Sequence, residues 1–412
     1  MTFFSWRSLL GCLILVSLNV HAERPEQHVV LISIDGFRHD YIEKHQARAM
    51  ANIAARGVRA ESMQPVYPAN TFPNHISLLT GLLPVNHGIV NNRFYDKSRH
   101  AYYSMGEAYK DSTWITAMPF WNLVETHGYP AATYFWPESD ARIGGQLPSY
   151  HFHYSKYSDY QQRIDQIIEW LTYPDATRPV FIAGYFSLVD TVGHDYGPDA
   201  PQTFAAVQKI DALVGQLYER IQALPIKVNL ILVSDHGMNA VDTSRIIYQD
   251  ELNISDDFLV LNEGEQILLY AKDGVSEAAV KAQEEALRAL ALPGVKVFDE
   301  HQRKHYHMPQ NPRTGDIIIT IDAPARFAKN KDSRIGPGGH GYLPEHPDMG
   351  ATFVATGPAF KQGVRLPRFS NLEVYPALAK VLGLELLRPI DGKLDVLNQA
   401  LAEQSPRGLD NE

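Results

Sequence analysis

The sequence predicts an α/β sandwich with a mostly parallel central sheet, and three observations predict it. Several runs are apolar on both faces, which is typical of strands buried in a parallel sheet. Patterns with apolar residues three or four positions apart, typical of helices, separate these runs. With 412 residues, the chain is also long enough to bury a large core. Strands that alternate with helices form a sheet covered by helices on both faces.

The N-terminal segment, residues 1–22, predicts a secretory signal peptide. Its only charged side chain is Arg7, and the apolar stretch Leu9–Val20 is too short to span a bilayer. Val20-His21-Ala22 provides small residues at the spacing that signal peptidase prefers. Cleavage would remove Cys12, the single cysteine, so the mature chain would carry no disulfide and no thiolate ligand. We therefore expect a periplasmic or secreted protein with no membrane anchor after cleavage.

Four strands and one long helix define the expected core, residues 23–240 and 339–412. The strands are expected at residues 28–34, 179–187, 228–234 and 351–355. A helix is expected over residues 201–224, because Phe204, Val207, Ile210 and the later apolar residues keep a helical spacing. Pro201 suits the first turn of this helix.

The segment 241–338 has a different pattern, with a hairpin at residues 257–271, a helix at 278–292 and a strand at 316–321. The glycine-rich stretch that follows, Arg334–Tyr342, is typical of a loop. We interpret 241–338 as a small α+β subdomain inserted into the core.

Acidic and histidine residues follow the expected buried strands. Ligands of α/β proteins bind beyond the carboxyl ends of the strands, so residues at successive strand ends are expected to meet. Each residue alone has an ordinary structural explanation, since an Asp-Gly pair is a common turn and a histidine can sit in a loop. Their joint placement has no such explanation. Five of the six residues, Asp35, Asp190, His194, Asp235 and His236, follow such strands, and the sixth, His340, precedes the last core strand.

This set of side chains predicts a metal site. Carboxylate and imidazole ligands without thiolate suit zinc first, with manganese or another divalent ion as alternatives. Six ligands exceed the needs of one catalytic ion and are about right for two, each with an open position. Paired ions about 4 Å apart clamp the attacking and leaving oxygens of a phosphoryl displacement. We therefore expect two Zn²⁺ per chain.

Thr71, in Pro68-Ala69-Asn70-Thr71-Phe72-Pro73, has two explanations. Threonine caps helices well, and an apolar run follows. A neighbouring metal ion would instead lower the pKa of its hydroxyl, as zinc does for water. A helix starting near Pro73 would direct its positive end and free N–H groups toward the same place.

Together these motifs resemble the nucleotide pyrophosphatase/phosphodiesterase family of the alkaline phosphatase superfamily. The resemblance runs from about residue 28 to 395, nearly the whole mature chain. Two further stretches match the family, at residues 135–137 and 355–360. The motifs that carry the resemblance are Asp35, Thr71-Phe72-Pro73-Asn74-His75, Asn92, Asp190-x-x-x-His194, Asp235-His236-Gly237-Met238 and Gly339-His340-Gly341-Tyr342.

The resemblance implies an alkaline-phosphatase-like fold and a role for each matching residue. One zinc ion would be held by Asp190, His194 and His340, and the other by Asp35, Asp235, His236 and the Thr71 oxygen. Thr71 would also be the nucleophile. Asn92 would donate to a phosphate oxygen, and Phe72 and Tyr185 would flank the nucleobase. Either Tyr154 or Tyr157 would complete this slot. Many members read Glu-Pro where this chain has Leu188-Val189, so contacts to the leaving group remain open.

The expected activity is hydrolysis of nucleotide phosphodiester or phosphoanhydride bonds, with release of nucleoside 5′-monophosphates through a covalent threonine–nucleotide intermediate. The net charge of −10 argues against stable nucleic-acid binding, so small nucleotides or other phosphodiesters are the expected partners. Two Zn²⁺, three Asp and a Thr71 alkoxide sum to a neutral centre, which favours a diester monoanion. Arg93, next to Asn92, would still permit a monoester. The alternatives are a phospholipase C-like diesterase of phospholipid head groups and a phosphomonoesterase. The oligomeric state and the physiological substrate stay open.

Overall fold

A computed structural model describes residues 24–403, so the predicted signal peptide lies outside the described residues. The centre of the fold is an eight-stranded sheet. In order across the sheet, its strands are β19 (Val364–Leu366), β2 (Val58–Ala60), β18 (Phe353–Thr356), β9 (Lys227–Val233), β1 (Gln27–Ile34), β8 (Phe181–Phe186), β6 (Ala131–Tyr134) and β7 (Tyr150–Phe152).

The sheet is mostly parallel, as the sequence predicts. At the centre, β1 pairs in parallel with both β8 and β9, so that Val30 lies opposite Ile182 on one side and Leu230 on the other. β6 is parallel to β8 and to β7. The strand expected at residues 351–355 is present as β18, but it runs antiparallel to β9 and β2. An apolar run predicts burial on both faces and does not specify the direction of the strand.

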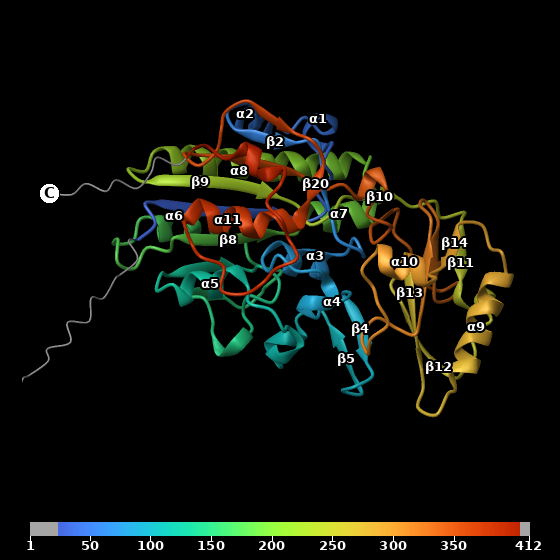
Figure 1. The fold of residues 1–412 in the computed structure, drawn as a ribbon. Helices are drawn as coiled ribbons and strands as arrows, with labels where there is room; N and C mark the ends of the chain where they lie inside the picture. The colour runs from blue at the N-terminus through green and yellow to red at the C-terminus, as the bar shows by residue number, and fades with distance from the viewer. Residues whose placement is uncertain (1–23, 404–412) are drawn as a thin grey trace, which may run out of the picture.

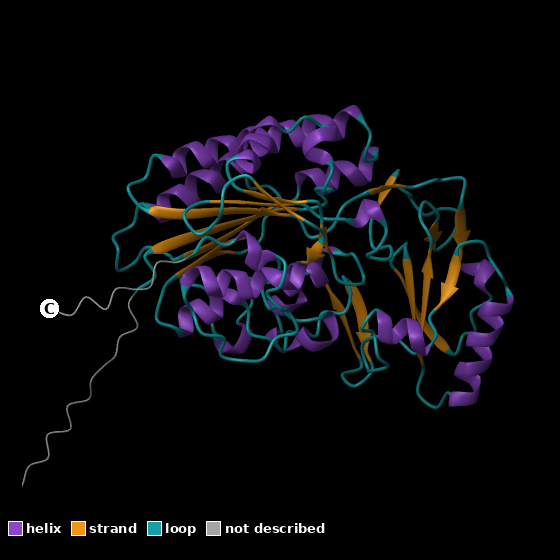
Figure 2. Ribbon diagram, turned by 45° about the horizontal axis from the view of Figure 1, so that its top comes forward, coloured by secondary structure: helices purple, strands orange, loops and turns teal. Residues whose placement is uncertain are grey.

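Helices cover both faces of this sheet, which Figure 2 shows as purple layers above and below the orange strands. Along β1 the side chains alternate between two cores. Val30 and Ile32 pack on the side that holds Leu217 of α8, and Val29 and Leu31 pack on the side that holds Leu378 of α11. The first face carries α1 (Tyr41–Lys44), α2 (Arg48–Ala55), α6 (Tyr160–Leu171), α7 (Leu188–Tyr196) and α8 (Pro201–Gln222), and the second carries α3 (Thr71–Leu78), α4 (Pro84–His87), α5 (Phe120–Thr126) and α11 (Val374–Leu382).

The segment predicted as an insertion forms its own antiparallel sheet, in the order β12-β13-β15-β14. One face of this sheet packs with α9 in a separate core that includes Ile267, Ile319 and Leu287. The other face, with Leu268 and Ile318, joins the core beneath the main sheet. The expected hairpin, helix and strand are all present. Their bounds are β12 (Phe258–Asn262), β13 (Gln266–Ala271), α9 (Glu277–Ala289), β14 (Val295–Val297), α10 (Glu300–His305) and β15 (Ile317–Ile321).

Short strand pairs connect the two sheets or extend from them. They are β11 (Ile246–Tyr248) with β16 (Arg326–Ala328), β10 (Asn239–Ala240) with β17 (Gly338–Gly339), β3 (Met63–Gln64) with β20 (Phe369–Ser370), and β4 (Arg93–Asp96) with β5 (Ala101–Ser104). The pair β10–β17 joins the segment after β9 to the segment that carries His340.

The carboxyl ends of the central strands point toward the insertion. In Figure 1 the arrowhead of β9 is directed at the side of the molecule that holds β10, α3 and the insertion. The expected site therefore lies where the main sheet, α3 and the insertion meet. Across residues 24–403, no helix combines the length and the apolar character needed to span a bilayer.

Candidate metal centre

Two groups of acidic and histidine side chains meet at the carboxyl end of the main sheet. Within each group, one potential ligand atom per residue lies within 4.8 Å of the others. We call Asp35, Asp235 and His236 the buried triad. We call Asp190, His194 and His340 the open triad. All six residues are those that the sequence predicts as metal ligands.

The buried triad stands at the ends of neighbouring strands. Asp35 follows β1, and Asp235 and His236 follow β9, so parallel pairing of these strands brings the three side chains together. Gly36 turns the chain here with φ of +67°, and its N–H donates to Asp235 Oδ1 at 3.2 Å. A Cβ at Gly36 would lie 3.0 Å from Asp190, so only glycine lets the two triads approach each other.

The open triad is built on a helix and a glycine loop. The sequence placed Asp190 and His194 beyond a strand end without predicting a helix there, but α7 begins two residues after the last residue of β8. The two residues therefore lie one helical turn apart on the same face. His340 reaches them from the segment after β17, with its ring centre 4.8 Å from that of His194. The His340 ring also stacks on His236, at 3.7 Å, which joins the open triad to the buried triad.

Burial and mutual charge shift the pKa values of these groups. Burial, with Asp235 and Asp190 nearby, raises the pKa of Asp35 well above its usual value. Burial alone would raise the pKa of Asp235, but the neighbouring His236 and His75 bring it well below its usual value. Burial, and then the adjacent His236 and His194, lower the pKa of His340. The pKa shifts of Asp235 and His340 favour the carboxylate and the neutral imidazole, which are the forms that bind a metal ion. The raised pKa of Asp35, and that of His236, which burial lowers and the neighbouring Asp235 raises, favour the protonated forms in the absence of a cation.

The donor set fits divalent metal ions. One carboxylate oxygen on each of Asp35, Asp190 and Asp235 is buried and has no hydrogen-bond partner among the described residues. The three imidazoles place Nδ1 next to a backbone carbonyl, that of Gly338 for His194, Gly237 for His236 and Ala69 for His340. Nδ1 is therefore the protonated nitrogen, and Nε2 keeps a lone pair for a ligand. Burying carboxylate oxygens without a hydrogen-bond partner costs free energy unless a cation binds them.

Thr71 lies beside the buried triad. It is the first residue of α3, and its Oγ1 is 3.2 Å from His236 Nε2. One turn later, His75 Nδ1 lies 2.8 Å from the Thr71 carbonyl and 3.3 Å from Asp235 Oδ2, while its Nε2 contacts Ser33 Oγ at 2.8 Å. Thr71 and His75 are four residues apart and therefore lie on the same face of α3. This spacing is the sequence feature that indicates His75 lies near the site.

The first turn of α3 offers fewer free N–H groups than the sequence suggests. The Phe72 N–H donates to Asn92 Oδ1 at 2.8 Å, Pro73 has no N–H, and the Asn74 N–H donates to the Asn70 carbonyl. Phe72 thus fixes the side chain of Asn92 next to Thr71. Because the Asn92 oxygen is an acceptor here, its NH₂ group is the part that faces outward as a donor.

The predicted aromatic residues differ in burial, and Phe72 is half-buried against the core that contains α3. Tyr185 is buried, and its hydroxyl donates a short hydrogen bond to Asp35 Oδ2. Tyr154 is 48% exposed, with its ring 6.4 Å from that of Tyr185. Tyr157 is 86% exposed and has no ring contact with Tyr185. Of the two candidates left open by the sequence, Tyr154 is the one next to the site.

Arg93, the residue that would permit a monoester substrate, has acidic and carbonyl partners on the insertion. Its guanidinium donates to Glu263 Oε1 at 2.7 Å and to the Asn262 carbonyl at 3.1 Å. The charge of Arg93 is therefore compensated by a carboxylate of its own chain.

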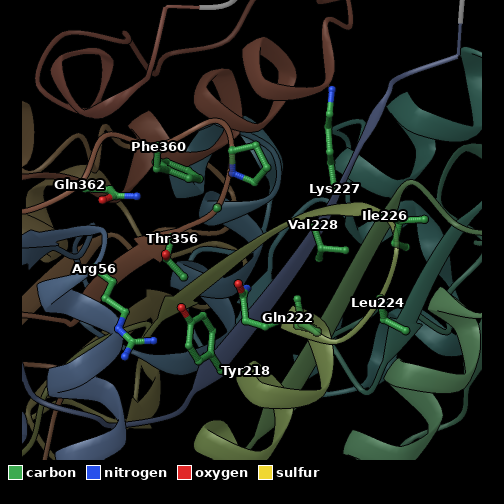
Figure 3. Close-up of a pocket in the computed structure, with 13 residues that line it drawn as sticks. Arg56, Tyr218, Gln222, Leu224, Ile226, Lys227, Val228, Thr356, Phe360 and Gln362 are labelled. Carbon is green, nitrogen blue, oxygen red and sulfur yellow. The ribbon is translucent and has the colours of Figure 1, made fainter.

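A cavity of about 560 Å³ lies at the opposite end of the main sheet. Figure 3 shows Tyr218 and Gln222 of α8 on one side of it and Thr356, at the end of β18, on the other. Lys227, the first residue of β9, also lines it, so the length of β9 separates this cavity from Asp235. The cavity is not part of the metal centre.

Comparison with known proteins identifies one family. The family model described as type I phosphodiesterase / nucleotide pyrophosphatase matches residues 29–343. Ectonucleotide pyrophosphatase/phosphodiesterase family member 3 of Bos taurus is 32% identical over 387 residues, which cover 90% of this chain and 44% of the relative. A venom phosphodiesterase of Naja atra is 32% identical over 385 residues, 90% of this chain and 46% of the relative. This chain thus spans less than half the length of these relatives.

Solved structures of the same family share the fold. Murine ectonucleotide pyrophosphatase/phosphodiesterase 5 superposes with a TM-score of 0.85 at 28% identity, covering 91% of this chain and 100% of the murine chain. One murine structure is an inactive variant, with alanine in place of a threonine, in complex with AMP. The human counterpart gives the same TM-score over 92% of this chain. The alkaline-phosphatase-like fold implied by the sequence motifs is thereby confirmed.

Proposed function

This chain belongs to the type I phosphodiesterase / nucleotide pyrophosphatase family, and on that premise we propose that it is an exported two-zinc hydrolase of nucleotides. The bonds it cleaves are phosphodiester or phosphoanhydride bonds, and its product is a nucleoside 5′-monophosphate. Its relatives are named as phosphodiesterases and pyrophosphatases, which are hydrolases. Two names, ectonucleotide pyrophosphatase and venom phosphodiesterase, support export, as does the predicted signal peptide of residues 1–22.

The observation that carries this proposal is the position of the Thr71 hydroxyl, 3.2 Å from His236 Nε2 at the edge of the buried triad. The buried triad would hold one zinc ion together with Thr71, and the open triad would hold the other. When bound, these ions supply Lewis acidity, which lowers the pKa of a nearby hydroxyl group and neutralises three carboxylates. The three unpartnered carboxylate oxygens support this assignment.

In the proposed reaction, Thr71 is the nucleophile. Its hydroxyl loses a proton to solvent, and its oxygen forms a bond to phosphorus while the bond from phosphorus to the leaving oxygen breaks. Water then attacks the threonine–nucleotide ester, which releases the nucleotide and restores the hydroxyl. The Asn92 NH₂ group donates to a phosphate oxygen, and this donor is preorganised by the 2.8 Å bond from Phe72. The inactive threonine variant of the murine relative supports a threonine in this role.

The nucleobase stacks on Phe72, which follows the nucleophile, and on the exposed ring of Tyr154, whose centre lies 6.4 Å from that of the buried Tyr185. Stacking of a base on an aromatic ring contributes about 1–3 kcal/mol. Tyr185 was expected to flank the base directly, but its burial and its bond to Asp35 suit it better to supporting both the slot and the metal ligand. The AMP complex of the murine relative supports a nucleotide as the ligand.

A diester is the preferred substrate over a monoester. A monoester dianion needs an extra cation, and Arg93, the candidate next to Asn92 in the sequence, donates to Glu263 instead. Phospholipid head groups and phosphate monoesters are the alternative substrate classes.

The first test compares three nitrophenyl esters on protein of measured zinc content. We expect the thymidine 5′-monophosphate ester to be hydrolysed faster than nitrophenyl phosphocholine and nitrophenyl phosphate. The proposal fails if either of the other two is the better substrate by kcat/KM.

The second test changes the nucleophile. Thr71→Ala should lower kcat by at least about 10³-fold with zinc content unchanged, because the metal ligands other than the hydroxyl remain. Thr71→Ser is the matched control and should retain part of the activity and form a covalent serine–nucleotide adduct, detectable by mass after an acid quench. Wild-type turnover in Thr71→Ala would exclude Thr71 as the nucleophile.

A further inference from the structure

Three buried side-chain amides connect the insertion to the open triad. Gln266, the first residue of β13, accepts a hydrogen bond from Asn91 Nδ2 at 2.9 Å. Asn91 Oδ1 accepts from Asn70 Nδ2 at 2.8 Å. Asn70 Oδ1 lies 3.1 Å from Nδ1 of His340. All three amide residues are at most 4% exposed. We call Gln266, Asn91 and Asn70 the amide chain.

The direction of the amide chain is fixed by a backbone group. The N–H of Asn92 donates to Asn91 Oδ1 at 2.8 Å, so this atom must be the oxygen and the other must be the NH₂ group. Asn91 therefore donates to Gln266 and accepts from Asn70. Asn70 must in turn present its own oxygen to His340. The positions of the oxygen and of the NH₂ group are therefore assigned for every amide in the chain.

The amide chain determines how His340 faces its ligand. Nδ1 of His340 has two acceptors, Asn70 Oδ1 and the Ala69 carbonyl, both at 3.1 Å. The Ala69 carbonyl alone would keep the proton of His340 on Nδ1. The Asn70 oxygen is a second acceptor for the same N–H and restrains the orientation of the ring. Nε2 is then directed at Asp190, whose Oδ1 lies 3.5 Å away. Partners of this kind orient a metal-binding imidazole and raise its basicity.

The backbone next to His340 lies close to the amide chain, at a position that requires glycine. Gly341 has φ of +103°, and a Cβ there would lie 2.6 Å from Asn70 Oδ1. Ala69 and Tyr342, the neighbours of Asn70 and Gly341, are buried in the core of the insertion together with Ile267. The insertion thus packs against the two segments that carry Thr71 and His340.

We propose that the amide chain is a positioning element through which the inserted segment sets the metal affinity of the open triad. Gln266 anchors it, Asn91 transmits the orientation, and Asn70 holds His340. Asn91 also orients the backbone of Asn92, so the same residue links the open triad to the group that donates to phosphate. This inference rests on the metal assignment in the proposed function.

The test measures metal binding without turnover. Protein stripped by a chelator is titrated with Co²⁺, whose visible absorption reports occupancy, followed by Zn²⁺ competition. His194→Ala identifies the binding phase of the open triad. Asn70→Ala and Asn91→Ala should weaken this phase by about 10-fold or more, the usual effect of losing a partner of a metal ligand. Gln266→Leu should weaken the open-triad phase by about threefold to tenfold, because two hydrogen bonds separate Gln266 from Asn70. The phase of the buried triad should not change.

Two further variants separate positioning from general damage. Gln283→Leu removes another buried glutamine of the insertion, which bonds Ser255 and Asn253 and does not touch the amide chain. It should leave both phases unchanged even where it lowers the melting temperature as much as Gln266→Leu does. Asn70→Asp keeps an acceptor for His340 but cannot donate to Asn91 Oδ1, so it should weaken the open-triad phase as Asn91→Ala does, although the His340 contact remains.

The proposal is overturned if Gln266→Leu and Asn91→Ala bind both ions as the wild type does, or if Gln283→Leu has the same effect as they have. It also fails if the wild type binds no metal at the open triad. A wild type that binds two ions and shows these shifts, yet does not hydrolyse nucleotides, would instead overturn the proposed function alone.

Discussion

The two triads contain similar ligands but are held in different ways. The side chains of Asp35, Asp235 and His236 are at most 2% exposed and stand on adjacent strand ends of one rigid sheet. In the open triad, Asp190, His194 and His340 are 15%, 34% and 8% exposed. They come from a helix and from a loop between the insertion and the core. The comparison suggests that the buried triad is preorganised by the sheet, and that the open triad depends on supporting contacts.

The support differs in chemical kind as well. The carboxylates of the buried triad have polar side chains beside them, with a hydrogen bond from the Tyr185 hydroxyl to Asp35 and with His75 Nδ1 at 3.3 Å from Asp235 Oδ2. The open triad is held by neutral groups, the Gly338 carbonyl on His194 and the Asn70 amide on His340. Neutral hydrogen bonds contribute less than charge-assisted ones, so the open triad should release its ion first.

The largest expected effect comes from removing one ligand of each triad. Asp235→Ala should abolish activity and reduce zinc at both positions, because Asp235 also bonds Gly36, which adjoins Asp190. It should also reduce the free energy of unfolding by about 1–3 kcal/mol, since it leaves the Gly36 N–H buried without its acceptor. His194→Ala should lose only the ion of the open triad and leave stability nearly unchanged.

Metal analysis and thermal melting of these two variants check the comparison. Equal zinc loss in Asp235→Ala and His194→Ala would show that burial does not distinguish the triads. An equal fall in melting temperature would lead to the same conclusion.

A smaller effect is expected from Tyr185→Phe. This change removes the hydrogen bond to Asp35 Oδ2 and keeps the ring, so the aromatic surface beside Tyr154 is preserved. Zinc affinity of the buried triad should fall by about 10-fold, while that of the open triad is unchanged. The KM for the thymidine ester should change little if Tyr154 provides the stacking surface.

Tyr154→Ala is the matched control for this variant, since it should raise KM and leave zinc affinity unchanged. A raised KM in Tyr185→Phe, with normal zinc binding, would instead show that the Tyr185 hydroxyl contacts the substrate.

Much of the fold and the meeting of the six candidate ligands could be predicted from the sequence, because five of these residues come shortly after the ends of buried strands. β1, β8 and β9 are continuous apolar runs, and each is followed within a few residues by its acidic or histidine residues. The direction of β18 could not be predicted, since an apolar run is symmetric. The helical placement of Asp190 and His194 was also missed, because Gly193 lies between them and α7 starts without a capping hydrogen bond.

The supporting residues were the least predictable part of the site. Asn70, Asn91 and Gln266 are up to 196 positions apart, and nothing in their local pattern indicates that they meet. Tyr185 lies in a buried strand, where its sequence context suggests packing and gives no sign of its bond to Asp35. Such contacts depend on tertiary structure, whereas the ligands are marked by the local end of a strand.

The smallest effect on catalysis is expected from a substitution of Glu138. This residue shows how burial shifts the pKa of a carboxyl group that has no histidine among the partners described for it. Glu138 is as buried as Asp35, but it has no imidazole next to it and accepts from Tyr103 at 2.5 Å and from the Gly106 N–H at 3.1 Å. Burial raises its pKa from 4.5 to about 7. The folded state therefore binds a proton more tightly than the unfolded state, so wild-type stability should fall as pH rises from about 4.5 to about 7.

Glu138→Gln removes this titration and keeps an oxygen to accept from Tyr103 and Gly106. At pH 4 the variant and the wild type should be equally stable, and at pH 8 the variant should be more stable by up to about 3 kcal/mol. Urea denaturation across this pH range measures the difference, and activity per bound zinc should be unchanged. If the two proteins show parallel pH profiles, then burial without a charged partner does not perturb this carboxyl group. The contrast between Asp35 and Asp235 would then have to come from their neighbours alone.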